Sequence, residues 1–258
     1  MKKPTILVTN DDGITAPGIR ALVEVASQFG NVIVIAPNSP QSGQGHALSL
    51  DKPLYLNKVN IFDPSVEAYE CSGTPVDCVK LAKSVILSGQ APDLCVSGIN
   101  HGSNNAINIL YSGTMSAAME AAIEGINSIG FSSLDYSHEG DLSAAKHYAA
   151  ILIDLVLKNG LEGAKLLNVN IPKLPLDQIK GIKVCHQAKS KWKEQYVKET
   201  DHHGQPCYWL TGEFVNLDLN PNCDYEQLQN GFVSVVPSMF DLTDYMVLDK
   251  LNQHIKNL

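Results

Sequence analysis

The sequence lacks several signatures that identify common enzyme classes. It contains neither the Gly-x-x-x-x-Gly-Lys phosphate loop of kinase-like NTPases nor a Gly-x-Gly-x-x-Gly turn that opens a helix after the first apolar run. A Gly-x-Ser-x-Gly nucleophile elbow is absent as well. These absences argue against a dinucleotide enzyme, a kinase-like NTPase and a serine hydrolase.

Long apolar runs, paired cysteines and excess positive charge are missing too. No apolar run approaches the ~20 residues that span a bilayer. A net charge of −8 argues against sequence-independent binding to the nucleic-acid backbone. Lys2 and Lys3 precede only a short apolar strand, so we expect no signal peptide. The six cysteines are scattered without metal-ligand spacing, which favours buried free thiols. We therefore predict a soluble, cytoplasmic protein without a membrane or nucleic-acid-polymer partner.

What the sequence does contain is a buried strand that ends in two adjacent carboxylates. The apolar run that begins at Thr5 ends in Asn10-Asp11-Asp12-Gly13, and such a run is typical of a parallel strand buried on both faces. Adjacent carboxylates raise each other's pKa, and a hard cation such as Mg²⁺ or Mn²⁺ removes that penalty. The alternative is a simple turn with Gly13, or a cap on the following helix.

Apolar runs alternate with amphipathic patterns along the first two thirds of the chain. We predict buried strands at 5–9, 32–36, 94–97, 126–131 and 165–171, two short antiparallel strands at 54–57 and 67–71, and helices at 17–30, 74–86, 113–124 and 141–159. This alternation predicts an α/β fold: a doubly wound, mostly parallel sheet in a Rossmann-like three-layer αβα arrangement.

The pattern changes near Gly181. Two hairpin strands are predicted at 184–196 and 208–215, followed by a polar segment at 224–231, a short strand at 232–236 and a helix at 248–255. We therefore divide the chain into an α/β core at 1–180, which carries the site, and a C-terminal β-hairpin and helix extension at 181–258. The extension packs on the core or exchanges with another subunit, and a single integrated domain is the alternative.

Polar loops follow three of the predicted strands. They offer Asn10, Asp11 and Asp12, then Ser39, Gln41, Ser42 and His46, and then residues 97–104 with Asn100 and His101. Because the carboxyl ends of neighbouring parallel strands meet at one edge of the sheet, these oxygens form a hard-donor set with positions left for water and phosphate. Such a set suits Mg²⁺ or Mn²⁺ rather than zinc or an iron–sulfur cluster.

The third loop enters a helix through Tyr111-Ser112-Gly113-Thr114. Free backbone N–H groups and hydroxyls at a helix N-terminus form an anion site, although a serine N-cap followed by glycine is the commoner arrangement. The two loop histidines, His46 and His101, are candidates for acid–base work, although most polar loop histidines are only solvated.

Five motifs in register resemble those of the survival protein E (SurE) family of metal-dependent nucleotidases. They are Val8-Thr9-Asn10-Asp11-Asp12-Gly13, Ala36-Pro37 with Ser42-Gly43, Gly73-Thr74-Pro75-Val76-Asp77-Cys78, Val96-Ser97-Gly98-Ile99-Asn100 and Tyr111-Ser112-Gly113-Thr114. The resemblance spans the first half of the chain. It implies one divalent cation per subunit, Mg²⁺ or Mn²⁺, held octahedrally by Asp11, Asp12, Ser42 and Asn100.

The resemblance also implies a reaction and an assembly. The reaction is hydrolysis of the 5′- or 3′-phosphate of nucleoside monophosphates, with a side activity on short polyphosphate. A metal-activated water is the expected nucleophile, Asp11 or Asp12 orients or deprotonates it, and the phosphate is bound by Asn10, Ser112, Gly113 and Thr114. The expected assembly is a homodimer or homotetramer that exchanges C-terminal elements.

Two positions depart from the family pattern. Ser103 stands where the family commonly has proline, and Asn108 lies near a position that is commonly acidic. These departures put the loop conformation or the nucleotide preference in doubt, but they touch none of the four predicted ligands.

Two rival classes fit the sequence poorly. A response-regulator receiver needs a third aspartate where this chain has Asn38 or Asn100. A sugar-nucleotide glycosyltransferase usually has two full α/β domains, for which the chain is too short.

Overall fold

Nine strands form one mixed sheet in the computed structural model, which describes residues 3–137 and 140–256. Their order across the sheet is β3-β4-β2-β1-β5-β6-β7-β11-β8. The strands are β1 (Thr5–Thr9), β2 (Asn31–Pro37), β3 (Leu56–Val59), β4 (Glu67–Cys71), β5 (Leu94–His101), β6 (Ser128–Ser133), β7 (Leu166–Ile171), β8 (Ile182–Val184) and β11 (Val233–Ser238). Only the β3–β4 and β7–β11 pairs are antiparallel, so the predicted doubly wound, mostly parallel sheet is confirmed.

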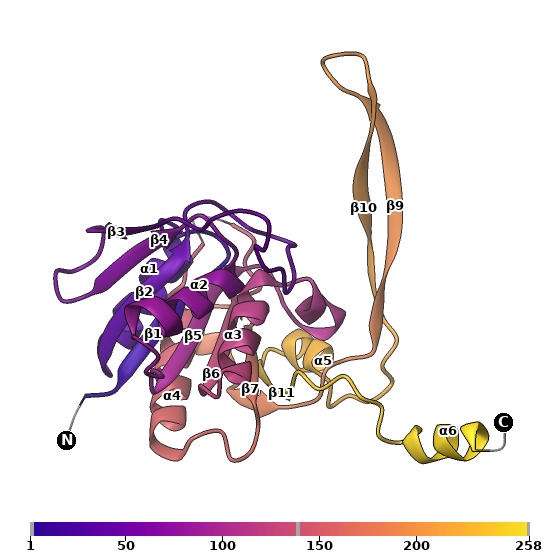
Figure 1. Cartoon of the computed structure of the whole chain (residues 1–258). Helices are drawn as coiled ribbons and strands as arrows, with labels where there is room; N and C mark the ends of the chain where they lie inside the picture. Colours follow the sequence, from indigo (N-terminus) through magenta and orange to yellow (C-terminus); the bar gives the residue numbers. More distant parts are fainter. Residues whose placement is uncertain (1–2, 138–139, 257–258) are drawn as a thin grey trace.

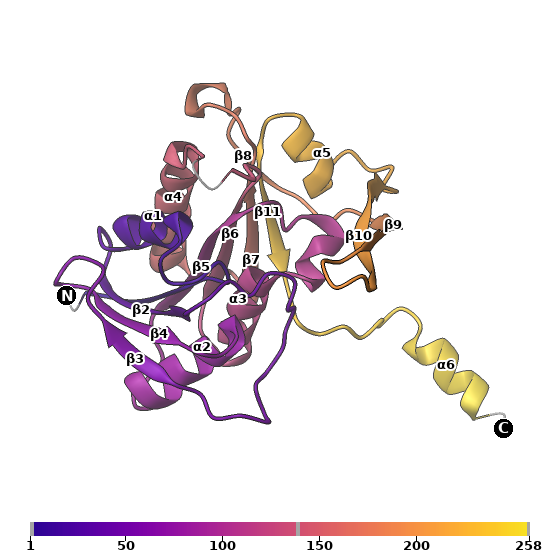
Figure 2. The ribbon, with the colours of Figure 1, turned by 90° about the horizontal axis from the view of Figure 1, so that it is seen from above.

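Helices cover both faces of this sheet (Figure 2). Helices α1 (Pro17–Ala26) and α4 (Ser143–Asn159) lie on one face, and α2 (Pro75–Leu81) and α3 (Gly113–Ile123) lie on the other. Along β1, Ile6 and Val8 pack in the cluster formed with α1 and α4, whereas Leu7 packs with α2 and α3. Both faces of the strand are therefore buried, which explains why its sequence does not alternate with polar residues.

The order in which the chain adds strands to the sheet reverses between β1 and β5, which are parallel neighbours. From β1 the chain moves outward through β2 to β4, and it then returns to β5 and continues to β6 and β7. The loops after β1 and β5 therefore diverge at a topological switch point, where open α/β sheets form their ligand crevice.

Several sequence predictions need correction. Strand β5 continues to His101 instead of ending at Ser97, and residues Ala106–Leu110 form a 3₁₀-helix rather than loop. The segment described only as polar at 224–231 contains helix α5 (Asp224–Gln229), in which Asp224 and Leu228 are the buried residues. Strands β11 and β8 extend the sheet beyond β7, so part of the predicted extension belongs to the core sheet.

The division of the chain at residue 180 stays a prediction. Strands β8 and β11 lie after that position but are hydrogen-bonded into the same sheet as β1. The buried Val233 and Val235 explain why β11 belongs to the core.

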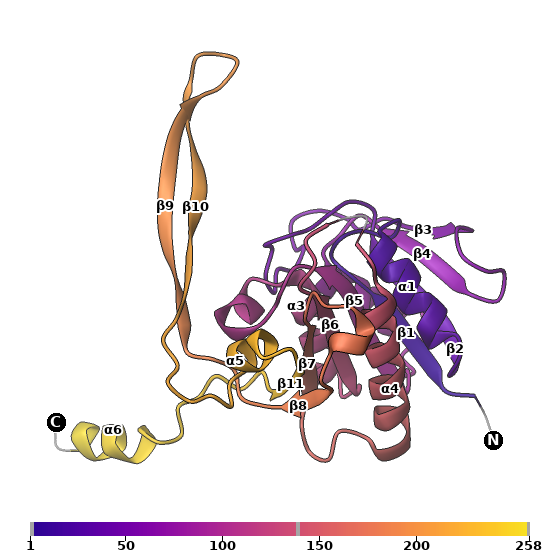
Figure 3. The same cartoon turned by 180° about the vertical axis from the view of Figure 1, so that it is seen from behind.

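Two other parts of the extension project away from this sheet. Strands β9 (Ser190–Thr200) and β10 (Pro206–Asn216) form a separate antiparallel hairpin that projects from the core (Figures 1 and 3). Helix α6 (Leu248–Ile255) matches its predicted bounds, has no buried residue, and lies away from the sheet. We call β9, β10 and α6 together the arm.

Two predictions from composition can also be compared with the structure. The six cysteines are free, and all but Cys207 are buried. Within residues 3–137 and 140–256, no helix has the length and apolar character needed to cross a bilayer.

Candidate functional site

The loops after β1, β2 and β5 meet at the carboxyl edge of the sheet beside the N-terminus of α3. Backbone hydrogen bonds fix the second loop against its neighbours: Gln41 N–H donates to the Asp11 carbonyl at 2.7 Å, and Gly45 N–H donates to the Tyr111 carbonyl at 3.2 Å. The loop that carries Ser42 is therefore tied both to the acidic pair and to the start of α3.

Asp11 is the most enclosed carboxylate of the site, with 4% of the residue exposed. The Thr114 hydroxyl donates to its Oδ1 atom. Gly113 lies directly against the same side chain, since a Cβ at that position would lie 2.6 Å from the Asp11 Cβ. Glycine at position 113 is thus required by the close approach of α3 to the carboxylate.

The pKa of Asp11 is raised to about 6, chiefly because the side chain is buried. The Thr114 hydrogen bond opposes this rise, and the neighbouring charge of Asp12 adds to it. Within the described part of the chain, no lysine or arginine forms an ion pair with either aspartate. The protein therefore leaves much of this negative charge uncompensated.

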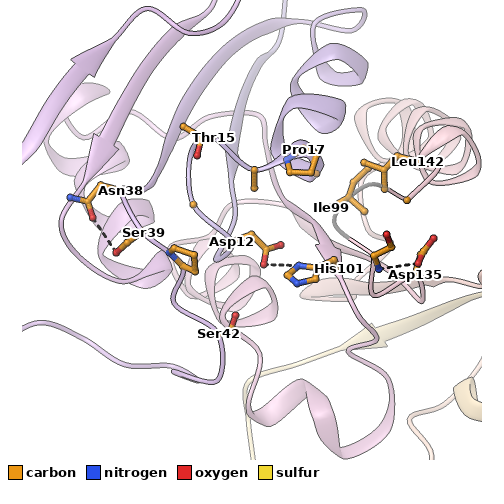
Figure 4. Close-up of a pocket in the computed structure, with 16 residues that line it drawn as sticks. Asp12, Thr15, Pro17, Asn38, Ser39, Ser42, Ile99, His101, Asp135 and Leu142 are labelled. Atoms are coloured by element: carbon orange, nitrogen blue, oxygen red, sulfur yellow. Dashed lines mark hydrogen bonds and ion pairs between the residues drawn. The ribbon is translucent and has the colours of Figure 1, made fainter. Parts of the chain in front are cut away.

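Asp12 points toward His101 at the end of β5 (Figure 4). Its Oδ1 atom lies 2.9 Å from His101 Nδ1, and the side chains are 9% and 32% exposed. The sequence did not indicate this contact, because the two residues lie far apart along the chain.

Two cavities lie beside the acidic turn, and Asp12 lines both of them. The larger, of about 480 Å³, includes Asp12, Ser42 and His101 but not Asp11 or Asn100. The smaller, of about 310 Å³, is lined by all four predicted metal ligands and by Ser112. We place the candidate site in the smaller cavity because it brings the whole donor set together.

The four predicted ligands supply only oxygen donors toward a cation. Asn100 is oriented by its amide N–H, which donates to the Gly102 carbonyl at 2.8 Å, and its Oδ1 atom lies 3.4 Å from Thr114 Oγ1. Among the described residues, no three or more His, Cys, Asp or Glu side chains gather as they would at a zinc site. Two carboxylates with a hydroxyl and an amide oxygen therefore fit Mg²⁺ or Mn²⁺ and do not fit zinc.

The predicted phosphate-binding residues separate into two groups. Ser112 lines the cavity, and its hydroxyl caps α3 by accepting the Met115 N–H at 3.0 Å. Asn10 and Thr114 have no exposed surface. The Asn10 amide N–H donates to the Gly13 carbonyl at 3.0 Å and closes the acidic turn, while Thr114 is bonded to Asp11. Their positions favour roles in orienting the carboxylates over direct contact with phosphate.

A buried amide network that sequence reasoning missed supports the loop after β5. Asn104 N–H donates to Asn170 Oδ1 and the Asn168 amide donates to the Asn104 carbonyl, both at 2.8 Å. The Asn170 amide donates in turn to Asn168 Oδ1 at 2.9 Å. Two asparagines in the otherwise apolar strand Leu166–Ile171 were the signal that could have found it.

The doubly wound fold and the oxygen donors at its switch point define the class: α/β proteins that bind their ligand at the carboxyl edge of the sheet. Within that class, the family model of survival protein SurE matches residues 6–194. The chain belongs to this family, as the sequence motifs predicted.

Related proteins agree with this assignment over nearly the whole chain. A protein of Christiangramia forsetii named 5′-nucleotidase SurE is 56% identical and covers 97% of this chain and 96% of its own length. A Flavobacterium psychrophilum protein of the same name is 54% identical with 98% of each chain covered. The crystal structure of the SurE protein from Aquifex aeolicus superposes with a TM-score of 0.82 at 41% identity, covering 98% of this chain and all of that one.

Proposed function

We propose that this chain is a divalent-metal-dependent nucleotidase that converts nucleoside 5′-monophosphates, and also 3′-monophosphates, to nucleoside and inorganic phosphate. Membership of the SurE family, in which close relatives are named 5′-nucleotidases, makes it a phosphoric monoester hydrolase. One cation per subunit, Mg²⁺ or Mn²⁺, and a side activity on short polyphosphate are parts of the same proposal, as is the cytoplasmic location expected from the sequence.

The observation that carries the proposal is the convergence of Asp11, Asp12, Ser42 and Asn100 on one cavity beside the N-terminus of α3. Asp11 is buried without a cationic side chain to balance it, which is the environment that a hard cation stabilises. The cavity has no lysine or arginine among its described lining residues. This supports a substrate with one phosphate group over a di- or triphosphate, whose extra charge needs further cations.

Each residue then has a distinct task. When bound, Mg²⁺ or Mn²⁺ would polarise the phosphoryl oxygens and lower the pKa of a water molecule enough for attack near neutral pH. Asp11 or Asp12 would orient that water or accept its proton, and Thr114 holds Asp11 in place. Ser112 and the backbone N–H groups of Gly113 and Thr114 face the charge that develops on the phosphoryl oxygens.

The arm supports a homo-oligomeric assembly. On α6, Leu248, Leu251 and Ile255 share one helical face and are 41%, 54% and 64% exposed. On the hairpin, the cross-strand pair Tyr196 and Leu210 is exposed as well. Apolar side chains presented on projecting elements favour burial against another subunit, so we propose a homodimer or homotetramer with exchanged C-terminal elements.

The direct test is phosphate release from a panel of 5′- and 3′-nucleoside monophosphates, the matching di- and triphosphates, and short polyphosphate, measured with Mg²⁺, with Mn²⁺ and with chelator. We expect metal-dependent release from the monophosphates and none with chelator. If protein that circular dichroism shows to be folded releases no phosphate with either metal, the proposal is contradicted.

A further inference from the structure

We propose that three aromatic side chains, Tyr111, Tyr136 and Trp192, form the platform on which the nucleobase of the substrate stacks. We call these residues the aromatic rim. The inference rests on the proposed nucleotidase function and assigns a site to the part of the substrate that the metal site does not recognise.

The aromatic rim and the candidate metal ligands line the same cavity of about 310 Å³. Its rings come from three separate segments: Tyr111 directly precedes the α3 cap, Tyr136 follows β6, and Trp192 lies on β9. The volume is at the lower end of the range of about 300–1,000 Å³ that small-ligand pockets occupy. A nucleotide whose phosphate lies at Ser112 therefore has its base within a cavity edged by aromatic rings.

Trp192 is held in a fixed orientation from two sides. Its indole N–H donates to Asn108 Oδ1 at 2.8 Å, and its ring packs edge-on against Phe214 with 5.6 Å between the centroids. Phe214 is itself stacked on Tyr225 at 5.3 Å. A ring that is positioned before the ligand arrives loses little conformational entropy on binding.

Tyr136 is positioned by the loop that follows β5 and its residue Asn100. Its ring packs on Gly102, where a Cβ would lie 2.7 Å from Tyr136 Cε1, so only glycine permits this contact. Its hydroxyl accepts the Ser103 N–H at 3.4 Å. The ring therefore lies against the loop after β5, close to the candidate metal ligand Asn100, instead of in the core.

The rim remains accessible although two of its rings are anchored: Tyr111, Tyr136 and Trp192 are 53%, 69% and 37% exposed. Aromatic faces stack on every base, and stacking strength instead of hydrogen bonding sets the preference. We therefore expect all the common bases to be accepted, with purine nucleotides favoured over pyrimidine nucleotides because of their larger stacking area.

The test compares AMP with ribose 5-phosphate, which has the same sugar and phosphate but no base. We expect the wild-type protein, with Mn²⁺ or Mg²⁺, to show a kcat/KM about tenfold or more higher for AMP, within the range that base–aromatic stacking supplies. Trp192→Ala should lower the AMP to ribose 5-phosphate ratio about tenfold, whereas Trp192→Phe, which keeps an aromatic face, should retain most of it.

Trp209→Ala is the matched control. Trp209 lies on the same hairpin, and its indole N–H donates to Glu199 at 2.8 Å, but it is outside the lining of the site cavity. This variant should leave the ratio unchanged. If Trp192→Ala does not fold, Tyr136→Leu serves the same test, because that ring lies on a surface loop.

The outcomes separate the two proposals. Hydrolysis of neither compound by the wild-type protein would overturn the nucleotidase function. Hydrolysis of both with equal kcat/KM would overturn the platform alone. A ratio that Trp192→Ala leaves unchanged would also overturn it. A shift in oligomeric mass in that variant would then assign the rim to an interface between copies of the chain.

Discussion

The edge of the sheet that holds the site and the arm that projects from it place their side chains in opposite environments. At the edge, polar groups such as Asp11, Asn104 and Asn170 are almost completely buried. On the arm, apolar groups such as Leu210 and Ile255 are 63% and 64% exposed. The two regions therefore suit different kinds of partner, which are a cation at the edge and another subunit at the arm in the proposed function.

The comparison shows which groups the fold satisfies by itself. The buried amides of the edge bond one another, as Asn104, Asn168 and Asn170 do, so little of their desolvation cost remains. The adjacent Asp11 and Asp12 differ, because no lysine or arginine in residues 3–137 or 140–256 pairs with them, and His101 contacts Asp12. Under the proposed function, a cation would complete the edge, and the apolar surface of another subunit would complete the arm.

Replacing the buried carboxylate should have the largest effect. For Asp11→Asn we expect turnover of nucleoside monophosphates to fall by about 10²–10³-fold or more, since a charged ligand is lost. The metal-free variant should be at least as stable as the wild type, because burial disfavours the charge that the substitution removes. Phosphate release and thermal unfolding in chelator measure the two effects.

The control for that variant is Asp154→Asn on α4, which removes an exposed carboxylate paired with Lys158. It should change neither quantity appreciably, because exposed i,i+4 pairs contribute only about 0.3–0.5 kcal/mol. Full activity in Asp11→Asn would show that this carboxylate is not part of the site.

Most of the fold was predictable because strands and helices of the core have clear apolar patterns. The bounds of α6 and the antiparallel β3–β4 pair followed from local sequence alone. Helix α5 did not, because Asp224–Gln229 offers little apolar periodicity and its N-terminal Asp224 is buried through hydrogen bonds to the backbone of Ala106 and Ala188. Such long-range polar contacts leave no local signal.

The site was predictable to a similar degree. The four predicted ligands line one cavity, because loops after neighbouring parallel strands meet at one edge. The Thr114 contact with Asp11 joins positions 103 residues apart, and the contributions of Tyr136 and Trp192 depend on how separate segments pack. The motifs of the sequence therefore identify residues that line the cavity, whereas the contacts that orient these residues need the structure.

The stability of the metal-free protein should also depend on pH, because of the buried Asp11. The folded pKa of Asp11 is raised to about 6 from an ordinary value of 3.8, so between these values the folded protein binds more protons than the unfolded one. Raising the pH through this window therefore lowers the stability of the metal-free protein by up to about 3 kcal/mol. A cation binds the ionised form, so stabilisation by metal should increase over the same window.

We would measure the shift in Tm caused by saturating Mg²⁺ at pH 5 and at pH 7.5. The shift should be larger at pH 7.5, and in Asp11→Asn, which cannot titrate at this position, the pH dependence should be much reduced. A metal-induced shift that is equal at both pH values in the wild type would contradict the assignment of the buried carboxylate as a ligand.

The smallest effect on the core should come from shortening the arm. A chain that ends at Met239 loses α6 but keeps β11 (Val233–Ser238), and α6 buries no residue in its own chain. We expect the oligomeric mass measured by light scattering to fall and Tm to lose its dependence on protein concentration. The double variant Leu251→Asp, Ile255→Asp should reproduce this result with the helix retained, since it places charge on the apolar face. An unchanged mass in both variants would mean that α6 is not completed by another subunit, and the contrast between edge and arm would then rest on the hairpin alone.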